Sequence, residues 1–138
     1  MKRFALKYWL LLCLGGLLSS GGCGSGGDVG HLVPADQLAR QALTAALDAW
    51  KAKQAAGGEL QLPQGAKIHV LDLDWRNGRN LDSYEITQSL PVEPNSPRMF
   101  SVKIVCDGGE PKDTIYHVIG ADPLWVFRDE DMRKTTGM

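Results

Sequence analysis

The three cysteines carry the most nucleophilic side chains of this 138-residue chain. A thiol can pair in a disulfide, attack as a thiolate, or accept a modification. Cys13 and Cys23 lie near the N-terminus, whereas Cys106 ends the alternating apolar stretch FSVKIVC. Three cysteines spaced in this way form no disulfide framework. We expect Cys106 to be a buried, inert thiol, because no local pattern places a base beside it.

The segment DLDWRNG is the strongest candidate for a metal site. Asp72 and Asp74 match the first two ligand positions of the calcium loop D-x-[DN]-x-[DN]-G. However, Arg76 occupies the third ligand position, Asn77 occupies the glycine position, and the twelfth position is not Glu. We therefore predict no metal and no cofactor, and we expect both aspartates to be solvated at the end of a strand. The acidic cluster 129–131 is likewise typical of a solvated polar segment.

The chain lacks the short motifs of several common catalytic centres. No CxxC, HExxH, P-loop or GxSxG sequence occurs in it. A histidine beside a carboxylate with a perturbed pKa could perform acid–base chemistry. No spacing in the sequence forces such a pair together, so the sequence favours a noncatalytic role.

The first 22 residues have the layout of a secretory signal peptide. Lys2, Arg3 and Lys7 form a basic region, residues 8–18 are apolar, and small residues follow. The apolar run is shorter than the ~20 residues that a helix needs to cross a bilayer. We therefore expect residues 1–22 to be removed and the protein to act outside the cytoplasm.

The residues at the end of this signal resemble the bacterial lipoprotein signal. Gly21 and Gly22 are small and precede Cys23, the position whose sulfur receives lipid in that family. The resemblance implies that lipid on Cys23 anchors the protein to a membrane. An aliphatic residue is usual where Ser20 stands, so cleavage to a soluble secreted protein is the alternative. Residues 23–33 are rich in glycine, which predicts a flexible tether.

The net charge argues against two kinds of partner. The complete chain carries a formal charge of −1, and removal of Lys2, Arg3 and Lys7 with the signal changes it to −4. The remaining lysines and arginines form no cluster in the sequence. We expect no nucleic-acid partner and no electrostatic attachment to anionic lipid. The identity of a protein partner stays open.

Residues 34–55 have the pattern of an amphipathic helix. Gly57 and Gly58 follow this segment and are typical of a helix end. The opposite face is polar, so the helix is expected to lie on a sheet with Trp50 as its core anchor. The apolar residues that recur at helical spacing on one face are Ala39, Leu43, Ala46, Leu47 and Trp50.

Beyond this helix the apolar period changes to two, which predicts strands. Residues 68–71 can form a short strand. The polar segment DGGEPKD predicts a hairpin between the second and third of four longer segments. These four segments are residues 81–87, 99–106, 114–119 and 124–128.

One helix followed by strands predicts an α+β fold. We expect one long N-terminal helix packed on a curved antiparallel sheet of about four strands. A single domain is predicted over residues 34–129, with a polar tail over residues 130–138. The helix end ALDAWKAK, the hairpin IVCDGGEPKDTIYHVIG and the closing strand LWVF resemble the cystatin-like and NTF2-like architecture. The Trp-Lys dipeptide and the closing VFR also resemble small bacterial lipoproteins, which implies no particular activity.

The NTF2-like resemblance implies a pocket between helix and sheet, lined by acids, histidine or tyrosine. Tyr84, His117 and Trp50 are the candidate pocket residues. An enzyme or small-ligand-binding protein using that pocket is the alternative to a noncatalytic binding or structural module. An interior filled by Trp50, Phe100 and Ile104 would favour the noncatalytic role. Further candidates that the same resemblance implies are His69, Tyr116, Asp72 and Asp74.

The cystatin-like resemblance implies an inhibitor function only where its protease-binding hairpins are present. The central QxVxG hairpin is missing from this chain. We therefore do not expect protease inhibition.

Overall fold

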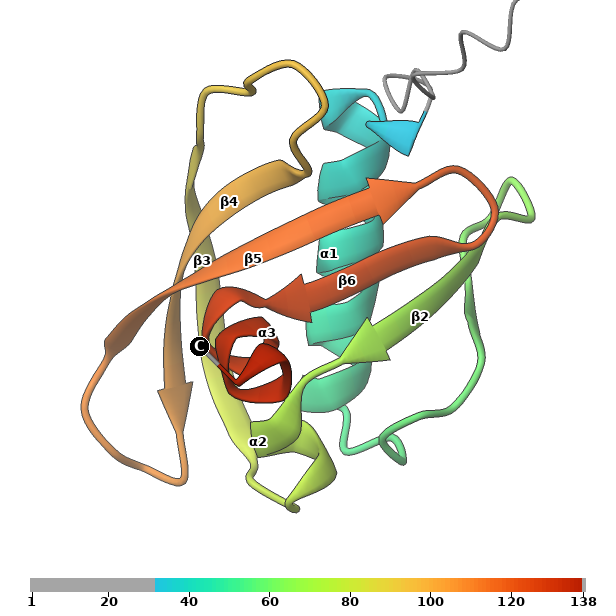
Figure 1. Ribbon diagram of the computed structural model, residues 1–138. Helices are drawn as coiled ribbons and strands as arrows, with labels where there is room; N and C mark the ends of the chain where they lie inside the picture. Colours follow the sequence, from blue (N-terminus) through green and yellow to red (C-terminus); the bar gives the residue numbers. More distant parts are fainter. Residues whose placement is uncertain (1–31, 138) are drawn as a thin grey trace, which may run out of the picture.

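A computed structural model describes residues 32–137 (Figure 1). The signal peptide 1–22, Cys23 and the tether up to residue 31 lie outside the described residues. Helix α1, Asp36–Lys51, precedes all strands; α2, Leu73–Arg76, separates two of them, and α3, Asp129–Thr136, follows the last. The strands are β1 Leu60–Gln61, β2 Lys67–Leu71, β3 Leu81–Ser89, β4 Arg98–Cys106, β5 Lys112–Gly120 and β6 Leu124–Arg128.

Helix α1 buries one face and ends earlier than its apolar pattern predicts. Asp36 lies in its first turn, where a carboxylate is favourable beside the positive end of the helix dipole. Lys53 has a left-handed backbone with φ 60°, so the chain leaves the helix before residue 55. The buried residues are Ala39, Ala42, Leu43, Ala46, Leu47, Ala49 and Trp50.

The six strands form one mixed sheet in the order β1-β2-β6-β5-β4-β3. Strand β2 pairs with β6 in parallel, through Ile68 opposite Leu124, and the other neighbours pair antiparallel. The α+β class is therefore confirmed, but an antiparallel sheet of about four strands is wrong. The chain leaves β2 through α2 to the far edge at β3 and returns strand by strand to β6, which pairs with β2.

The predicted hairpin forms the centre of the sheet. Strands β4 and β5 pair antiparallel, with Phe100 opposite Tyr116. Phe100, Val102 and Ile104 of β4 face α1 and are nearly inaccessible, as the alternating pattern predicts. Burial of each such side chain contributes about 1.5–3 kcal/mol. Figure 1 shows α1 lying across one face of the curved sheet, so the main core lies between these two layers.

Helix α3 covers part of the opposite face of the sheet. It contacts β5 and β6, directly after β6 ends at Arg128. His117 points away from α1, because its neighbours Tyr116 and Val118 belong to the core, yet His117 is only 6% exposed. The segment 130–138, expected to be a polar tail, thus contains most of helix α3, which covers the outer face of the sheet beside β5 and β6.

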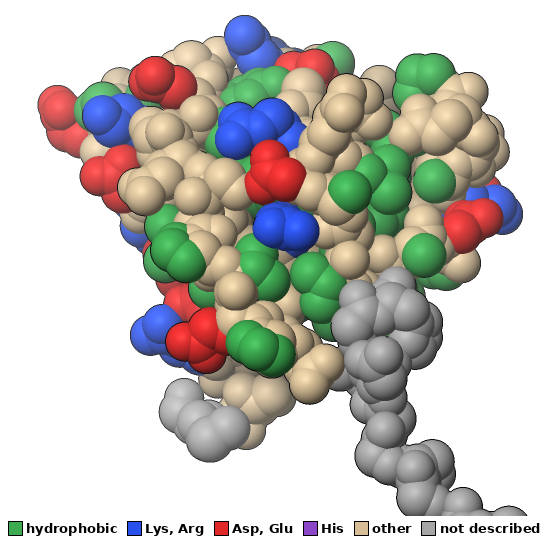
Figure 2. Space-filling view, turned by 90° about the horizontal axis from the view of Figure 1, so that it is seen from above, with side chains coloured by type: hydrophobic (Ala, Val, Ile, Leu, Met, Phe, Trp, Pro, Cys, Tyr) green, Lys and Arg blue, Asp and Glu red, His purple; other side chains and the backbone are tan. Residues whose placement is uncertain are grey.

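The surface seen in Figure 2 mixes charges of both signs. Basic and acidic side chains lie next to each other among apolar and uncharged ones on this face. No large patch of one sign is visible there. This face therefore offers no basic stripe of the kind that nucleic-acid-binding proteins use.

Candidate functional site

A groove with mostly apolar walls opens between the end of β2, helix α2 and helix α3. Its volume is about 310 Å³, at the lower end of the ~300–1,000 Å³ typical of small-ligand sites. Leu71 and Met132 on its walls are 45% and 42% exposed, which leaves two large apolar side chains open to a ligand. We call this the apolar groove; its lining residues are Leu71, Asp72, Leu73, Arg76, Phe127, Asp131, Met132, Thr135 and Thr136.

One wall of the apolar groove is helix α2, whose N-terminus is capped by Asp72. Strand β2 ends at Leu71, and the Asp72 carboxylate accepts a hydrogen bond from the Trp75 backbone N–H at 3.0 Å, which starts α2. The Trp75 ring stacks on Trp50 with 6.2 Å between ring centroids. The Trp75 indole N–H donates to the Gln54 carbonyl at 2.9 Å. The short helix is therefore fixed to the end of α1.

The other wall is α3, and acidic residues of its first turn hold it in place. Asp131 accepts a hydrogen bond from the Leu73 backbone N–H at 2.9 Å, which joins α3 directly to α2. Glu130 pairs with Lys112 of β5 at 2.8 Å. Asp129 contacts the His117 ring nitrogen Nε2 at 3.1 Å. The expectation that residues 129–131 are merely solvated is wrong, because each has a separate partner.

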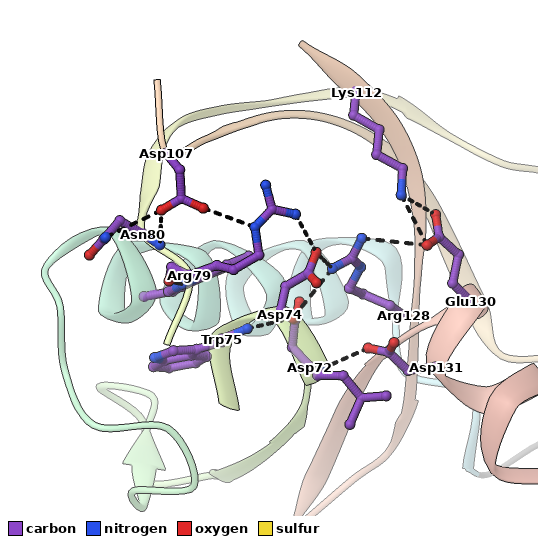
Figure 3. Close-up of polar contacts among 12 residues, drawn as sticks. Asp72, Asp74, Trp75, Arg79, Asn80, Asp107, Lys112, Arg128, Glu130 and Asp131 are labelled. Carbon is purple, nitrogen blue, oxygen red and sulfur yellow. Dashed lines mark hydrogen bonds and ion pairs between the residues drawn. The ribbon is translucent and has the colours of Figure 1, made fainter. Parts of the chain in front are cut away.

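A buried polar cluster adjoins the apolar groove through Asp72, which also lines the groove. Asp72 accepts a hydrogen bond from the Tyr116 hydroxyl at 2.6 Å. One Arg128 nitrogen lies 3.5 Å from the same carboxylate (Figure 3). That Arg128 nitrogen donates to Asp74 at 2.5 Å. Asp72, Tyr116 and Arg128 are at most 2% exposed. The expectation of solvated aspartates is therefore wrong for Asp72, because β5 and β6 cover it with their own polar groups.

The two aspartates of this cluster have opposite pKa shifts. Burial raises the pKa of Asp72, and hydrogen bonds from Tyr116 and Trp75 with the charge of Arg128 offset this only in part. Burial also acts to raise the pKa of Asp74, but the hydrogen bond and charge of Arg128, with Arg79, hold it below its usual value. Burial and the Asp72 charge raise the pKa of Tyr116 well above its usual range.

The geometry of the cluster favours a structural role over acid–base chemistry. The groups with shifted pKa values bond mainly to one another, and Arg128 and Tyr116 are each 1% exposed. A substrate would have to displace these contacts to reach either side chain. The cluster joins β2, α2, β5 and β6, and so positions the walls of the apolar groove.

The three candidate pocket residues do not meet in one cavity. Trp50 is a core residue, and its indole N–H donates to the Arg79 carbonyl at 2.8 Å. The Tyr84 hydroxyl donates to Asp48 of α1 at 2.6 Å on the inner side of the edge strand β3. His117 lies on the outer face, where its ring stacks on Phe127 at 5.1 Å. Because side chains alternate along β5, His117 points to the outer face of the sheet, whereas Trp50 and Tyr84 lie on the inner side.

The remaining chemically interesting residues are also dispersed. His69 on β2 lies against Trp125, with 4.7 Å between ring centroids. Cys106 is a free, buried cysteine, and burial raises the pKa of its thiol. Within residues 32–137, no three His, Cys, Asp or Glu side chains are grouped as a metal site requires. Asp72 and Asp74 bind an arginine instead.

A second groove lies on the other side of α2. Its volume is about 340 Å³. Lys53, Arg76 and Arg79 line it together with the Trp50 and Trp75 pair, and its lining contains no acidic residue. We call it the basic groove; the rest of its lining is Gln54, Ala55, Ala56, Gly78 and Asn80.

Of the residues that line these grooves, sequence reasoning named Asp72 and Trp50 as candidates and missed most of the others. Arg76 was considered only as a residue that does not match the calcium-loop pattern, and Met132 lies in the segment expected to be a polar tail. A signal for α3 was present, because acidic residues 129–131 precede Arg133 and Lys134, the charge order of a short helix. No sequence signal places α3 beside α2, because 58 positions separate Leu73 from its partner Asp131.

Comparisons with known proteins assign the chain to no group. No family model matches it, and no curated protein or solved structure is significantly similar to it.

Proposed function

We propose that this protein is a lipid-anchored, extracytoplasmic binding module without catalytic activity. In this proposal Cys23 carries the lipid, the glycine-rich residues 23–33 are the tether, and the apolar groove receives an apolar ligand. The observation that carries the binding role is the apolar groove, in which Leu71 and Met132 remain about half exposed beside Phe127.

The packing of the interior supports a noncatalytic role. Trp50, Phe100 and Ile104 fill the space between α1 and the sheet and are at most 2% exposed. Tyr84 and His117 each contact one carboxylate, but they lie on opposite faces of the sheet. An enzyme of the NTF2-like kind would need these groups to converge on one substrate.

The sequence of the first 23 residues supports the location. A basic region, a short apolar run and small residues before Cys23 are the features of a lipoprotein signal. No helix within residues 32–137 is long and apolar enough to cross a membrane. We extend the proposal to the architecture: a helix on a curved sheet is compatible with a cystatin-like or NTF2-like domain carried by a small bacterial lipoprotein.

The anchor is tested by metabolic labelling with palmitate in a bacterial host. We expect the unmodified sequence to incorporate label and to fractionate with membranes. Cys23→Ala should lose both properties. Cys106→Ala is the matched control, because its thiol is buried in β4, and it should keep the label. Equal labelling of the Cys23→Ala variant would exclude the anchor.

The apolar groove is tested with the neutral dye Nile red. We expect the dye to bind and to gain fluorescence, and Met132→Gln to weaken binding about fivefold, because the side chain loses most of its hydrophobic contribution. Ile115→Gln is the control, since Ile115 is 36% exposed on β5 but does not line the groove. If both variants bind the dye like the unmodified protein, the groove is not a binding site.

A further inference from the structure

Arg76 lies where two grooves of different character meet. It is the last residue of α2 and belongs to the lining of both the apolar groove and the basic groove. Figure 1 shows α2 and α3 next to each other at one end of the sheet, and the C-terminal end of α1 lies close to α2, where Trp50 stacks on Trp75. A ligand with an apolar part and a charged part could therefore contact both grooves across Arg76.

The charges around this junction favour an anion. Lys53, Arg76 and Arg79 are the charged residues of the basic groove, and all three are cations. Arg79 is already paired with Asp74 at 3.3 Å and Asp107 at 2.9 Å. Among residues 32–137, Lys53 and Arg76 have no side-chain hydrogen bond and no ion pair with a carboxylate. Their side chains are both exposed, so their charges are available to a ligand.

The carboxylates that line the apolar groove are already bonded within the protein. Asp72 accepts hydrogen bonds from Tyr116 and Trp75 and is 2% exposed. Asp131 accepts one from the Leu73 backbone N–H and lies 4.0 Å from the Lys134 ammonium. Neither carboxylate projects freely into the groove, so an anionic ligand does not meet an unpaired negative charge there.

We propose that the two grooves together form a site for a free fatty acid. The hydrocarbon chain lies in the apolar groove between Leu71, Phe127 and Met132, and the carboxylate pairs with Arg76 and Lys53. The apolar groove of about 310 Å³ is small, which favours one acyl chain over the two chains of a phospholipid. This inference rests on the proposed binding function, and it adds the chemical class of the ligand.

The test is calorimetric titration of the full-length chain carrying Cys23→Ser, so that no acyl group of its own competes. The probes are octanoate and decanoate below their micellar concentrations, with decanol as a neutral ligand of the same length as decanoate. We expect decanoate to bind more tightly than decanol at low salt. Each added methylene should increase affinity about fourfold until the groove is full.

Substitutions separate the role of the charge from that of the apolar walls. Arg76→Gln should weaken decanoate binding about threefold to fivefold and leave decanol within twofold, because a solvent-exposed ion pair is modest in strength. Adding Lys53→Gln should weaken decanoate binding further. Met132→Gln should weaken both ligands alike. Arg40→Gln, on α1 and outside both grooves, is the control and should change neither. Circular dichroism and urea midpoints establish that each variant is folded.

The outcomes distinguish this inference from the function on which it rests. Equal binding of decanol and decanoate, both weakened by Met132→Gln and unaffected by Arg76→Gln, would overturn the fatty-acid site and keep an apolar binding groove. If neither decanol nor decanoate binds, the fatty-acid site is overturned. If Nile red also fails to bind, the apolar groove is not a binding site. Binding only to phosphatidylglycerol vesicles would also overturn the inference, because the ligand would then be a membrane surface.

Discussion

At the scale of single residues, the buried Asp72–Arg128 contact has a large energetic consequence. Both side chains are nearly inaccessible, and Arg128 also bonds to Asp74. A buried ion pair need not be stabilising as a whole, because removing two charges from water is costly. Removing one partner is strongly destabilising, because the other charge then remains buried without compensation.

Arg128→Met should therefore lower the free energy of unfolding by about 3–5 kcal/mol. The measurement is urea denaturation followed by circular dichroism. Lys67→Met is the control, because Lys67 forms an exposed ion pair with Glu59, and exposed pairs contribute ~0–1 kcal/mol. Equal losses in the two variants would contradict the importance of the buried cluster.

The opposite pKa shifts of Asp72 and Asp74 predict opposite pH dependences. The pKa of Asp74 is lowered in the folded state, so its contribution is present above the usual carboxyl pKa of about 4 and is lost as pH falls below it. The pKa of Asp72 is raised, so the folded protein binds that proton more tightly and gains stability as pH falls through the raised value.

The comparison uses the unfolding free energies of the unmodified protein, Asp72→Asn and Asp74→Asn between pH 7 and pH 3. As pH falls, the difference between the unmodified protein and Asp74→Asn should shrink. Over the same pH range, the free energy of unfolding of the unmodified protein should instead increase relative to that of Asp72→Asn. Differences that change in the same direction would contradict the assigned shifts.

At the scale of elements, the β5–β6 turn and the packing of α1 decide how closely the strands and helices approach. Gly120 ends β5 with φ 99°, and an added Cβ would lie 2.5 Å from the Pro123 carbonyl oxygen. Gly108, in the β4–β5 connection, also has positive φ, but a Cβ added there would have no atom within 4 Å. Substitution of Gly108 therefore introduces backbone strain alone, whereas substitution of Gly120 adds a steric clash to that strain.

Gly120→Ala should destabilise the protein by more than about 2 kcal/mol, since backbone atoms must move as well as adopt a strained conformation. Gly108→Ala should cost about 1 kcal/mol, the strain of a left-handed residue alone. Both values come from urea denaturation. Similar losses for the two variants would show that the close approach to Pro123 is not limiting.

Helix α1 depends on the side chains that it buries against the sheet. Leu43 is 0% exposed in the middle of its apolar face, whereas Leu71 at the end of β2 is 45% exposed. Leu43→Ala should lower the free energy of unfolding by about 2–5 kcal/mol, through lost burial and the cavity left behind. Leu71→Ala should cost less than about 1 kcal/mol. A large loss on substitution of Leu71 would indicate that this side chain is enclosed in solution rather than half exposed.

At the scale of the whole molecule, the two faces of the sheet are covered unequally. Helix α1 covers the inner face, whereas α3 covers the outer face near the C-terminal end of β6, where Asp129 contacts His117 of β5. Trp125 lies on the uncovered part, opposite Ile119, and is 40% exposed, whereas Trp50 and Trp75 are buried. One of the three tryptophans in the described residues is therefore open to solvent.

Iodide quenching of tryptophan fluorescence should detect this difference. In a Trp9→Phe background, we expect one accessible emitting component alongside a protected one. Adding Trp125→Phe should remove the accessible component, because iodide does not reach buried indoles. Persistence of strong quenching in the double variant would show that Trp50 or Trp75 is accessible.

Several parts of the fold were predictable because they depend on local periodicity. Phe100, Val102 and Ile104 alternate in the sequence and face the core of β4, and the polar residues that follow predicted the hairpin to β5. Trp50 was predicted as a core residue from the helical spacing of its neighbours. A period of two or of 3.6 residues reports which side of an element is apolar, and therefore which side is buried.

By itself, the sequence determined the α+β class and the apolar faces of α1 and β4, and it predicted a signal peptide that ends just before Cys23. Only the tertiary structure decided that β2 pairs in parallel with β6, that Asp72 is buried with Arg128, and that Arg76 joins two grooves. The physical reason is distance along the chain. The hydrophobic period is a property of a few neighbouring residues. The β2–β6 pairing and the Asp72–Arg128 contact instead join segments 56 positions apart, and their adjacency depends on how the whole sheet closes.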